Sequence, residues 1–293
     1  MPAAERNYDL IAFDLDGTVF DSPTNQVLSE RVVRALRAAH EAGAVIAVAS
    51  GRPTWMLGDE LPGAPWLDWA ITCNGARVSG VHAVGDDIAA AFPRPLACKV
   101  LEAVHEFGGT MSIHTNRSSL MENAQLRSMS KRFAEEAGDE GSYTGNPIEN
   151  LLATFGGVAV ESGVEAFAER TDDQLDKIDC TLPSADAANA LEARLEELGG
   201  VDAARLGSYE LELTAKGASK GEACEALCRR LGIEVSRTVA FGDSGNDLSM
   251  AGRELTFVAM GNATDEVKAA ADAIADPVTE DGVATWLEAN LLA

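Results

Sequence analysis

The sequence has few basic residues. It holds 23 Lys and Arg against 47 Asp and Glu, which gives a formal net charge of −24 at pH 7. A field of this sign repels polyanions and argues against binding to nucleic acid or to an anionic membrane surface. The acidity is spread over many segments and is typical of a solvated, soluble surface. An anionic ligand would therefore need a local positive site.

Long apolar runs and cysteines are also scarce. No apolar run approaches the roughly 20 residues of a membrane span, and residues 1–6 lack the apolar stretch of a signal peptide, so we expect a cytoplasmic protein. The five cysteines are scattered and odd in number, which argues against a disulfide framework. Cys224 and Cys228 are four residues apart and could share a metal, but no histidine lies near them in sequence. We expect reduced thiols rather than a zinc site.

The order of apolar segments predicts the fold class. Residues 8–13, 44–49 and 69–73 read as short buried strands, with a helix over 29–42. The pattern returns near the C-terminus, with strands over 238–241, 256–260 and 273–274 and a helix over 264–271. This alternation predicts an α/β fold, a Rossmann-like doubly wound parallel sheet.

The middle of the chain has a different pattern. Longer helices are predicted over 96–107, 128–136 and 185–198, strands over 155–160 and 209–213, and a surface turn over 138–147. We interpret 84–213 as an inserted α+β domain, with the core formed by 1–83 and 214–293. A chain of 293 residues is long enough for a domain with such an insertion.

Polar residues follow each predicted core strand. Because ligands bind outside the carboxyl ends of the strands in an open parallel sheet, we expect these residues to converge. They are Asp14, Asp16 and Thr18 after the first strand, Ser50 to Arg52 after the second, Asn74 and Gly75 after the third, and residues 242–247 after the fourth.

These residue types suit phosphoryl chemistry. One carboxylate of the Asp14 and Asp16 pair can attack phosphorus while the other handles a proton. Carboxylates at Asp14, Asp16 and Asp243 are the hard oxygen ligands that Mg²⁺ prefers. Ser50 would supply a hydroxyl and Lys220 a cation to the phosphate oxygens.

Lys220 is placed by its neighbours. Ser219 and Glu222 have the spacing of a capping box, which puts Lys220 in the first turn of a helix. A lysine adds to the positive end of the helix dipole there, which suits an anion site. Lys216 is the rival candidate for the same role.

Six motifs occur in an order that resembles the haloacid dehalogenase superfamily, and most closely its Cof-type phosphatases with a C2-type cap. The motifs are D-x-D-G-T at 14–18, S-G-R-P at 50–53, N-G-A at 74–76, G-A-S-K-G at 217–221, G-D-S-G-N-D at 242–247 and M-G-N-A at 260–263. The match covers both halves of the core. Each motif alone is short, but six in order make an accidental match improbable.

The resemblance implies roles for these residues. Asp14 would be the nucleophile that forms an aspartyl-phosphate, and Asp16 would protonate the leaving oxygen and then activate water, held in place by Thr18. The resemblance also implies that Ser50 and Lys220 bind the phosphoryl group and that Asn246 steadies Lys220 or the phosphate. Mg²⁺ would be bound by Asp14, the Asp16 backbone carbonyl and Asp243, with support from Asp247. The substrate would be bound by Arg52, Asn74 and Gly75.

The cap matches the family only diffusely. Candidate contacts to the substrate's leaving group are Arg52, Asn74, Arg77, His114, Asn116 and Arg117. His114 follows an apolar segment, and a structural histidine is favoured there over a substrate contact.

We therefore expect a Mg²⁺-dependent phosphatase of small phosphomonoesters, with sugar phosphates as the leading class and nucleotides or phosphorylated cofactors next. Asp16 favours a phosphatase or phosphomutase, because superfamily members that cleave carbon–halogen bonds lack this Asp and the transport ATPases carry Thr. The alternatives are a phosphomutase such as phosphomannomutase and a non-catalytic sensor of phosphorylated ligands. The expected partner is a small phosphorylated metabolite, and the sequence leaves the oligomeric state open.

Overall fold

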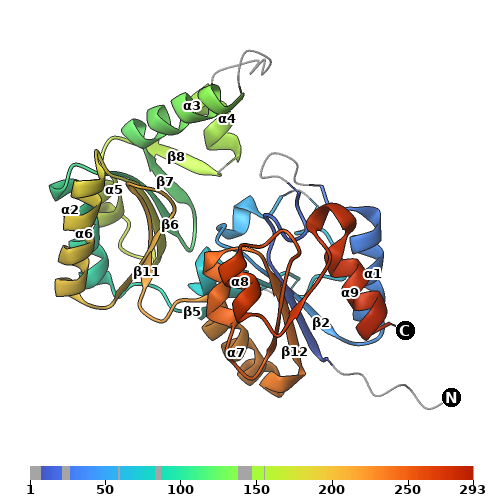
Figure 1. Cartoon of the computed structure of the whole chain (residues 1–293). Helices are drawn as coiled ribbons and strands as arrows, with labels where there is room; N and C mark the ends of the chain where they lie inside the picture. The colour runs from blue at the N-terminus through green and yellow to red at the C-terminus, as the bar shows by residue number, and fades with distance from the viewer. Residues whose placement is uncertain are drawn as a thin grey trace. The chain divides into compact units, whose positions relative to one another are not determined.

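The computed structural model describes residues 8–21, 27–58, 60–82, 87–137, 147–154 and 156–292, and it divides the chain into two compact units (Figure 1). Unit 1 comprises Met1–Ala89 and Ser219–Ala293, and unit 2 comprises Ala90–Ala218. Unit 2 thus starts and ends a few residues later than the predicted insertion over 84–213. The reason is strand pairing: β5 (Ile88–Ala89) hydrogen-bonds to the sheet of unit 1, and β11 (Glu210–Ala215) continues past residue 213 in the sheet of unit 2.

Unit 1 is built on an eight-stranded sheet in the order β14-β13-β12-β1-β2-β3-β4-β5. Its strands are β1 (Leu10–Phe13), β2 (Val45–Ala49), β3 (Trp69–Thr72), β4 (Arg77–Gly80), β5, β12 (Thr238–Gly242), β13 (Thr256–Ala259) and β14 (Ala273–Ile274). The strands from β14 to β3 are parallel, which confirms the predicted doubly wound parallel sheet. β4 and β5 add antiparallel strands at one edge. These two were not predicted, since they carry no long apolar run.

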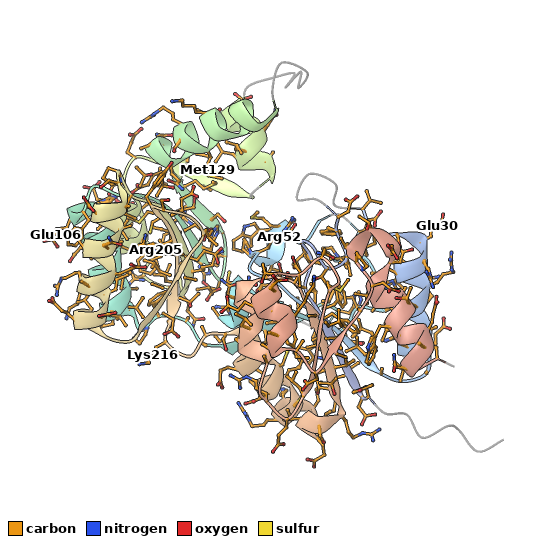
Figure 2. All side chains as sticks on the ribbon, in the orientation of Figure 1. Glu30, Arg52, Glu106, Met129, Arg205 and Lys216 are labelled. Atoms are coloured by element: carbon orange, nitrogen blue, oxygen red, sulfur yellow. The ribbon has the colours of Figure 1, made fainter. Side chains whose placement is uncertain are left out.

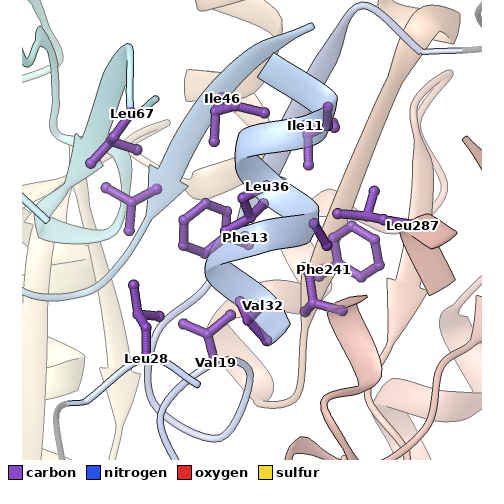
Figure 3. Packing of buried hydrophobic residues seen from close by; sticks show 14 of the residues in the cluster. Ile11, Phe13, Val19, Leu28, Val32, Leu36, Ile46, Leu67, Phe241 and Leu287 are labelled. Carbon is purple, nitrogen blue, oxygen red and sulfur yellow. The ribbon is translucent and has the colours of Figure 1, made fainter. Parts of the chain in front are cut away.

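Helices cover both faces of this sheet because its strands are apolar on both sides. Ile11 and Phe13 of β1 pack with α1 (Glu30–Glu41) and α9 (Gly282–Asn290), while Leu10 and Ala12 pack in the cluster that includes α7 (Lys220–Leu231) and α8 (Asp265–Ala270). Figure 3 shows Phe13 next to Leu36 of α1. Each fully buried large side chain contributes about 1.5–3 kcal/mol, so the strand ends are firmly held.

Unit 2 contains a six-stranded sheet in the order β10-β11-β9-β6-β7-β8. Its remaining strands are β6 (Thr110–Thr115), β7 (Ser119–Glu122), β8 (Gly157–Val160), β9 (Leu175–Thr181) and β10 (Val201–Arg205), and its helices are α2 (Arg94–Glu106), α3 (Asn123–Ala137), α4 (Pro147–Thr154), α5 (Gly163–Glu169) and α6 (Ala185–Leu198). One face of the sheet, with Ile113, Ile178 and Leu213, packs on α2, α5 and α6. The other face carries Ser112 and Asp179, which lie opposite each other in the ladder.

Several elements of unit 2 were anticipated and others were not. The predicted helices correspond to α2, α3 and α6, and the predicted strands to β8 and β11, although residue 155 lies outside the described part. The turn predicted over 138–147 also lies outside it, apart from Pro147, where α4 begins. β7, β9 and β10 were missed, because polar residues such as Lys177 and Asp179 interrupt the apolar pattern. None of the helices among the described residues combines the length and the apolar character that a membrane span requires.

Candidate active site

The carboxyl ends of four core strands meet at one edge of the sheet. The ladder places Phe13 of β1 beside Val48 of β2 and Phe241 of β12, and Ala49 beside Ile71 of β3. The polar residues that follow these strands therefore come together as predicted from the topology.

Lys220 is the centre of this group. Its Nζ lies 2.8 Å from Oδ1 of Asp14 and 2.7 Å from Oδ1 of Asp247, and its side chain is fully buried. Ser219 caps α7 by accepting a hydrogen bond from the backbone N–H of Glu222 at 3.2 Å, so Lys220 does begin the helix. Burial lowers the pKa of Lys220, but the two carboxylates outweigh burial and raise it. The rival Lys216 is exposed.

Three carboxylates cluster beside this lysine. Asp14, Asp243 and Asp247 each offer an oxygen, and these oxygens lie within 4.8 Å of one another. Burial raises the pKa of Asp14 to about 7, with Lys220 opposing and Asp247 adding to the rise. Burial also raises the pKa of Asp243 to about 6. Asp14 and Asp247 are buried and Asp243 is half-buried. One lysine cannot balance these three carboxylates and a hard divalent cation would, so the donor set fits Mg²⁺.

Asp247 is fixed by the turn that follows β12. Its Oδ2 accepts hydrogen bonds from the backbone N–H groups of Asp243 at 2.9 Å and Ser244 at 3.0 Å, which caps the 3₁₀ helix η5 (Gly245–Met250). A Cβ on Gly242 would lie 2.3 Å from Cγ of Asp247. Glycine at 242 therefore allows the carboxylate to fold back onto its own strand end, and its other oxygen is left to face Lys220.

Gly17 and Thr18 support Asp243. Gly17 has φ +78°, and a Cβ there would lie 2.2 Å from Oδ2 of Asp243. The hydroxyl of Thr18 donates to Oδ1 of Asp243 at 3.4 Å. The Thr18 hydroxyl thus bonds Asp243 at the end of β12 and not Asp16, and the predicted support of Asp16 by Thr18 stays a prediction.

Asp16 is not one of the three clustered carboxylates, and it pairs with Arg52, which is labelled in Figure 2. Nε and Nη2 of Arg52 donate to the two carboxylate oxygens of Asp16 at 2.8 Å and 2.5 Å. Nη1 of Arg52 donates to the carbonyl of Met56 at 2.9 Å, and the guanidinium carbon lies 5.7 Å from the centre of the Phe20 ring. Arg52, predicted to bind substrate, is thus an immediate partner of the predicted acid/base residue.

The remaining core candidates form a hydrogen-bonded rim. The hydroxyl of Ser50 accepts from the backbone N–H of Arg52 at 3.2 Å, and Nδ2 of Asn246 donates to Oδ1 of Asn74 at 3.1 Å. Asn246 was predicted to steady Lys220 or the phosphate; Lys220 is instead held by carboxylates, as described above. Asn74 has φ 57°, a conformation that costs a non-glycine residue free energy and that clusters at functional sites.

Gly75 follows Asn74 and approaches α7 closely. A Cβ there would lie 2.2 Å from the carbonyl oxygen of Ser219, so glycine lets the start of the helix pack against this turn. The prediction of a substrate contact at Gly75 stays a prediction.

One residue of the site had no predicted role. Nδ2 of Asn262 donates to the carbonyl of Gly17 at 2.8 Å, and its Oδ1 accepts from the backbone N–H of Val278 at 2.8 Å. It ties the first motif to the chain beyond β13. The sequence marks Asn262 as a member of the M-G-N-A motif, but the position of the motif in the chain does not predict which groups Asn262 bonds.

The other candidates have structural partners. Both ring nitrogens of His114 are engaged, Nδ1 with Ser119 at 2.7 Å and Nε2 with Asp179 at 2.7 Å. The further pairs are Asn116 Oδ1 with the backbone N–H of Gln174 at 2.9 Å, Arg117 with Asp173 at 3.6 Å and Arg77 with Asp87 at 3.2 Å. The favoured structural role of His114 agrees with its burial.

Comparison with known proteins identifies the family. The family model described as haloacid dehalogenase-like hydrolase matches residues 11–287. The chain is 28% identical over 286 residues to the pyridoxal phosphate phosphatase of Escherichia coli (strain K12), covering 97% of this chain and 98% of that protein. It is 30% identical over 265 residues to the HMP-PP phosphatase of Cronobacter sakazakii, covering 88% and 86%.

A solved structure agrees in fold as well. A haloacid dehalogenase-like hydrolase from B. subtilis superposes with a TM-score of 0.79 at 26% identity, covering 96% of this chain and 99% of that one. These likenesses and the six ordered motifs confirm the predicted superfamily and the predicted enzyme class. The chain therefore belongs to the haloacid dehalogenase-like hydrolase family, in which it is a phosphatase.

Proposed function

We propose that the protein hydrolyses small phosphomonoesters in a Mg²⁺-dependent reaction, through a phosphate ester of the Asp14 carboxylate. One observation carries the proposal: Asp14 is buried against Lys220, with carboxylate oxygens of Asp243 and Asp247 near enough to share a cation. A buried, charge-compensated carboxylate at the carboxyl end of a parallel sheet suits a nucleophile better than a structural residue.

The residues divide the reaction into two displacements. In the first, an oxygen of Asp14 forms a bond to phosphorus, the bond to the leaving oxygen breaks, and Asp16 gives that oxygen a proton. In the second, Asp16 takes a proton from water as the water oxygen attacks phosphorus, and the bond to Asp14 breaks to release inorganic phosphate. Lys220 and the hydroxyl of Ser50 would hold the phosphoryl oxygens, and positioned acid/base catalysis would contribute about 10²–10⁴ in rate.

Asp14, Asp243 and Asp247, with the backbone carbonyl of Asp16, would hold the Mg²⁺. When bound, the ion supplies positive charge that offsets the negative charge of the phosphate and of the carboxylates.

Arg52 has to release Asp16 during the cycle, because the first displacement needs a protonated Asp16 carboxyl, whereas a guanidinium that donates to both oxygens favours the carboxylate, which has no proton to give. A phosphate in the site offers the guanidinium an alternative anionic partner. This exchange would reconcile the observed pair between Arg52 and Asp16 with the predicted contact between Arg52 and substrate.

The substrates we propose are small phosphorylated metabolites. Sugar phosphates are the class implied by the family resemblance, and the names of the two relatives add pyridoxal phosphate and HMP-PP. A phosphomutase would have to protect the phosphorylated Asp14 from water, and a sensor would bind phosphate esters without turnover.

The test is phosphate release from a panel of sugar phosphates and ring phosphates, with and without Mg²⁺. The Asp14→Asn variant keeps the size of the side chain and removes the nucleophile, and Asp172→Asn, at an exposed turn residue, is the matched control. We expect Mg²⁺-dependent release by the wild type and the control and none by Asp14→Asn. Release by Asp14→Asn at the wild-type rate would refute the nucleophile assignment; binding without release would favour the sensor.

A further inference from the structure

The face of the unit 2 sheet opposite α2 and α6 carries a continuous polar network. Nζ of Lys177 lies 2.9 Å from Oδ1 of Asp179 and 2.5 Å from Oε1 of Glu212. Oδ2 of Asp179 lies 2.7 Å from Nε2 of His114, whose Nδ1 lies 2.7 Å from the hydroxyl of Ser119. The network runs across β11, β9, β6 and β7. Groups bonded on both sides in this way have little freedom to turn, so they present a fixed pattern of charge.

A cavity of about 190 Å³ opens on this face, wholly within unit 2. Its polar lining includes Ser112, His114, Gln125, Asp179, Glu210 and Glu212. A protein cavity of roughly 150 Å³ holds one benzene molecule, so this one has room for a single six-membered ring with small substituents. It is smaller than the roughly 300–1,000 Å³ of pockets that take larger ligands.

Ser112 is the unusual member of the lining. Its side-chain oxygen is buried and has no hydrogen-bond partner among the residues that the structure describes, and the residue is only 3% exposed. A buried hydroxyl without a partner is unfavourable, because it has given up its hydrogen bonds to water. Oδ1 of Asp179, also in the lining, is buried and has the ion pair to Lys177 but no hydrogen bond among the described residues. Two polar atoms beside the cavity that lack hydrogen bonds indicate that a bound ligand completes the network.

The charge around the cavity determines which ligand charge is favoured. Asp179, Glu210 and Glu212 contribute three carboxylates, against the cation of Lys177 and the ring of His114. Even with a protonated imidazole the negative charges are in excess, so a phosphate or carboxylate would be repelled. A neutral or cationic molecule with N–H or O–H groups would be attracted.

Apolar side chains complete the lining. Met129 of α3, labelled in Figure 2, is half-buried, and Leu206 is 64% exposed although it borders the cavity. A ring in the cavity would cover part of Leu206, and removing this apolar surface from water would favour binding.

We propose that this cavity binds a neutral or cationic one-ring compound that carries N–H or O–H donors, with Ser112 as a direct contact. The compound is either the phosphate-free part of the substrate or a separate effector. Assigning the source rests on the proposed function; binding itself does not.

The first experiment measures binding without turnover. The full chain is titrated with pyridoxine, an aminopyrimidine and, as an anionic control, benzoate, and amide chemical shifts are followed by NMR. We expect the two neutral donors to shift amides of β6, β9 and β11 and benzoate to have a weaker effect. Ser112→Ala should weaken binding about three- to tenfold, the worth of one hydrogen bond. The exposed Ser208→Ala is the matched control and should bind as the wild type does.

The melting temperature separates a ligand contact from a structural role. Ser112→Ala removes an unsatisfied group, so its melting temperature should equal or exceed that of the wild type. The proposal is overturned if no neutral probe shifts these amides, if benzoate binds more tightly than both, or if Ser112→Ala binds them unchanged.

The second experiment assigns the source. Phosphate release is measured from pyridoxine phosphate and from p-nitrophenyl phosphate, which has no such donors. If the cavity holds part of the substrate, Ser112→Ala raises KM for the first ester alone and free pyridoxine competes with it. If the guest is an effector, free pyridoxine changes kcat for both esters without competing. A chain that releases phosphate from neither ester would refute the proposed function, while the NMR titration would still decide the cavity.

Discussion

Replacing Gly17 by alanine should lower activity by on the order of 10²-fold while leaving the fold intact. Gly17 has φ +78°, and an added Cβ would lie 2.2 Å from Oδ2 of Asp243, a distance that real Cβ atoms do not tolerate. The Asp243 carboxylate must therefore move, and the hydrogen bond from Thr18 to Asp243 must lengthen with it.

The free-energy cost of placing alanine in a left-handed backbone conformation can be measured separately at Gly232, elsewhere in unit 1. Gly232 ends α7 with φ +70°, and nothing lies within 4 Å of its added Cβ. Alanine at either position costs about 1–2 kcal/mol for the left-handed backbone. At about 2–4 °C for each kcal/mol, both variants should melt roughly 2–8 °C below the wild type. Only Gly17→Ala also displaces a residue of the proposed metal site.

The activity should separate the two variants. A shift of about 1 Å in a catalytic group costs on the order of 10²-fold in rate. We expect kcat/KM of Gly17→Ala to fall by about that factor and its half-saturating Mg²⁺ concentration to rise, while Gly232→Ala keeps wild-type values within about threefold.

The measurements are melting temperature by differential scanning fluorimetry and phosphate release at a series of Mg²⁺ concentrations. If Gly17→Ala and Gly232→Ala had equal activity, the close approach of Asp243 to this turn would not matter to the reaction. If Gly17→Ala lost the fold outright, its circular dichroism spectrum would show that at once.

Two further substitutions test the charges. Lys220→Met leaves buried carboxylates without their cation and should lower the free energy of unfolding by about 3–5 kcal/mol, measured by chemical denaturation. The exposed control Lys216→Met should change the free energy of unfolding by less than about 0.5 kcal/mol. Equal effects of the two substitutions would contradict the assignment of Lys220. Burial raises the pKa of Asp179, but Lys177 and His114 outweigh burial and hold that pKa well below the usual 3.8 in the folded protein. The stability that Asp179 contributes is therefore present above pH 3.8 and is lost as the pH falls toward the pKa of Asp179 in the folded protein. Asp179→Asn should therefore lower the free energy of unfolding by about 2 kcal/mol at pH 7, a moderate figure because the side chain is 32% exposed. In the same denaturation assay, the difference in free energy between the variant and the wild type should shrink between pH 4 and pH 2. A difference that stays constant would refute the link between the pKa of Asp179 and stability.

The core of the candidate site could be predicted because its signals are local. Short apolar strands place Asp14, Ser50 and Asp243 at strand ends, and parallel pairing brings those ends to one edge of the sheet. The Ser219 cap likewise fixes the start of α7 and hence the position of Lys220. Each of these depends on residues within a few positions of one another, and on a topology that follows from the order of the segments.

Which side chains pair could not be predicted in this way. Thr18 was expected to support Asp16 and bonds Asp243, and Arg52 was expected at the substrate and bonds Asp16. Both pairings are set by turn geometry and by differences of a few ångströms between side chains, which motif order does not encode. In unit 2, the polar residues of β7 and β9 hid the strands themselves from a pattern based on apolar periodicity.

The sequence by itself therefore determined the parallel strands of the unit 1 core, the residues at their ends and the chemistry those residues can perform, because all three follow from local patterns. Only the tertiary structure decided how Asp14, Lys220 and Asp247 share charge, and that the polar network of unit 2 surrounds a cavity with an unsatisfied Ser112. The physical reason is that burial and hydrogen bonding depend on distances between residues far apart in the chain, and these exist only once the sheets have formed.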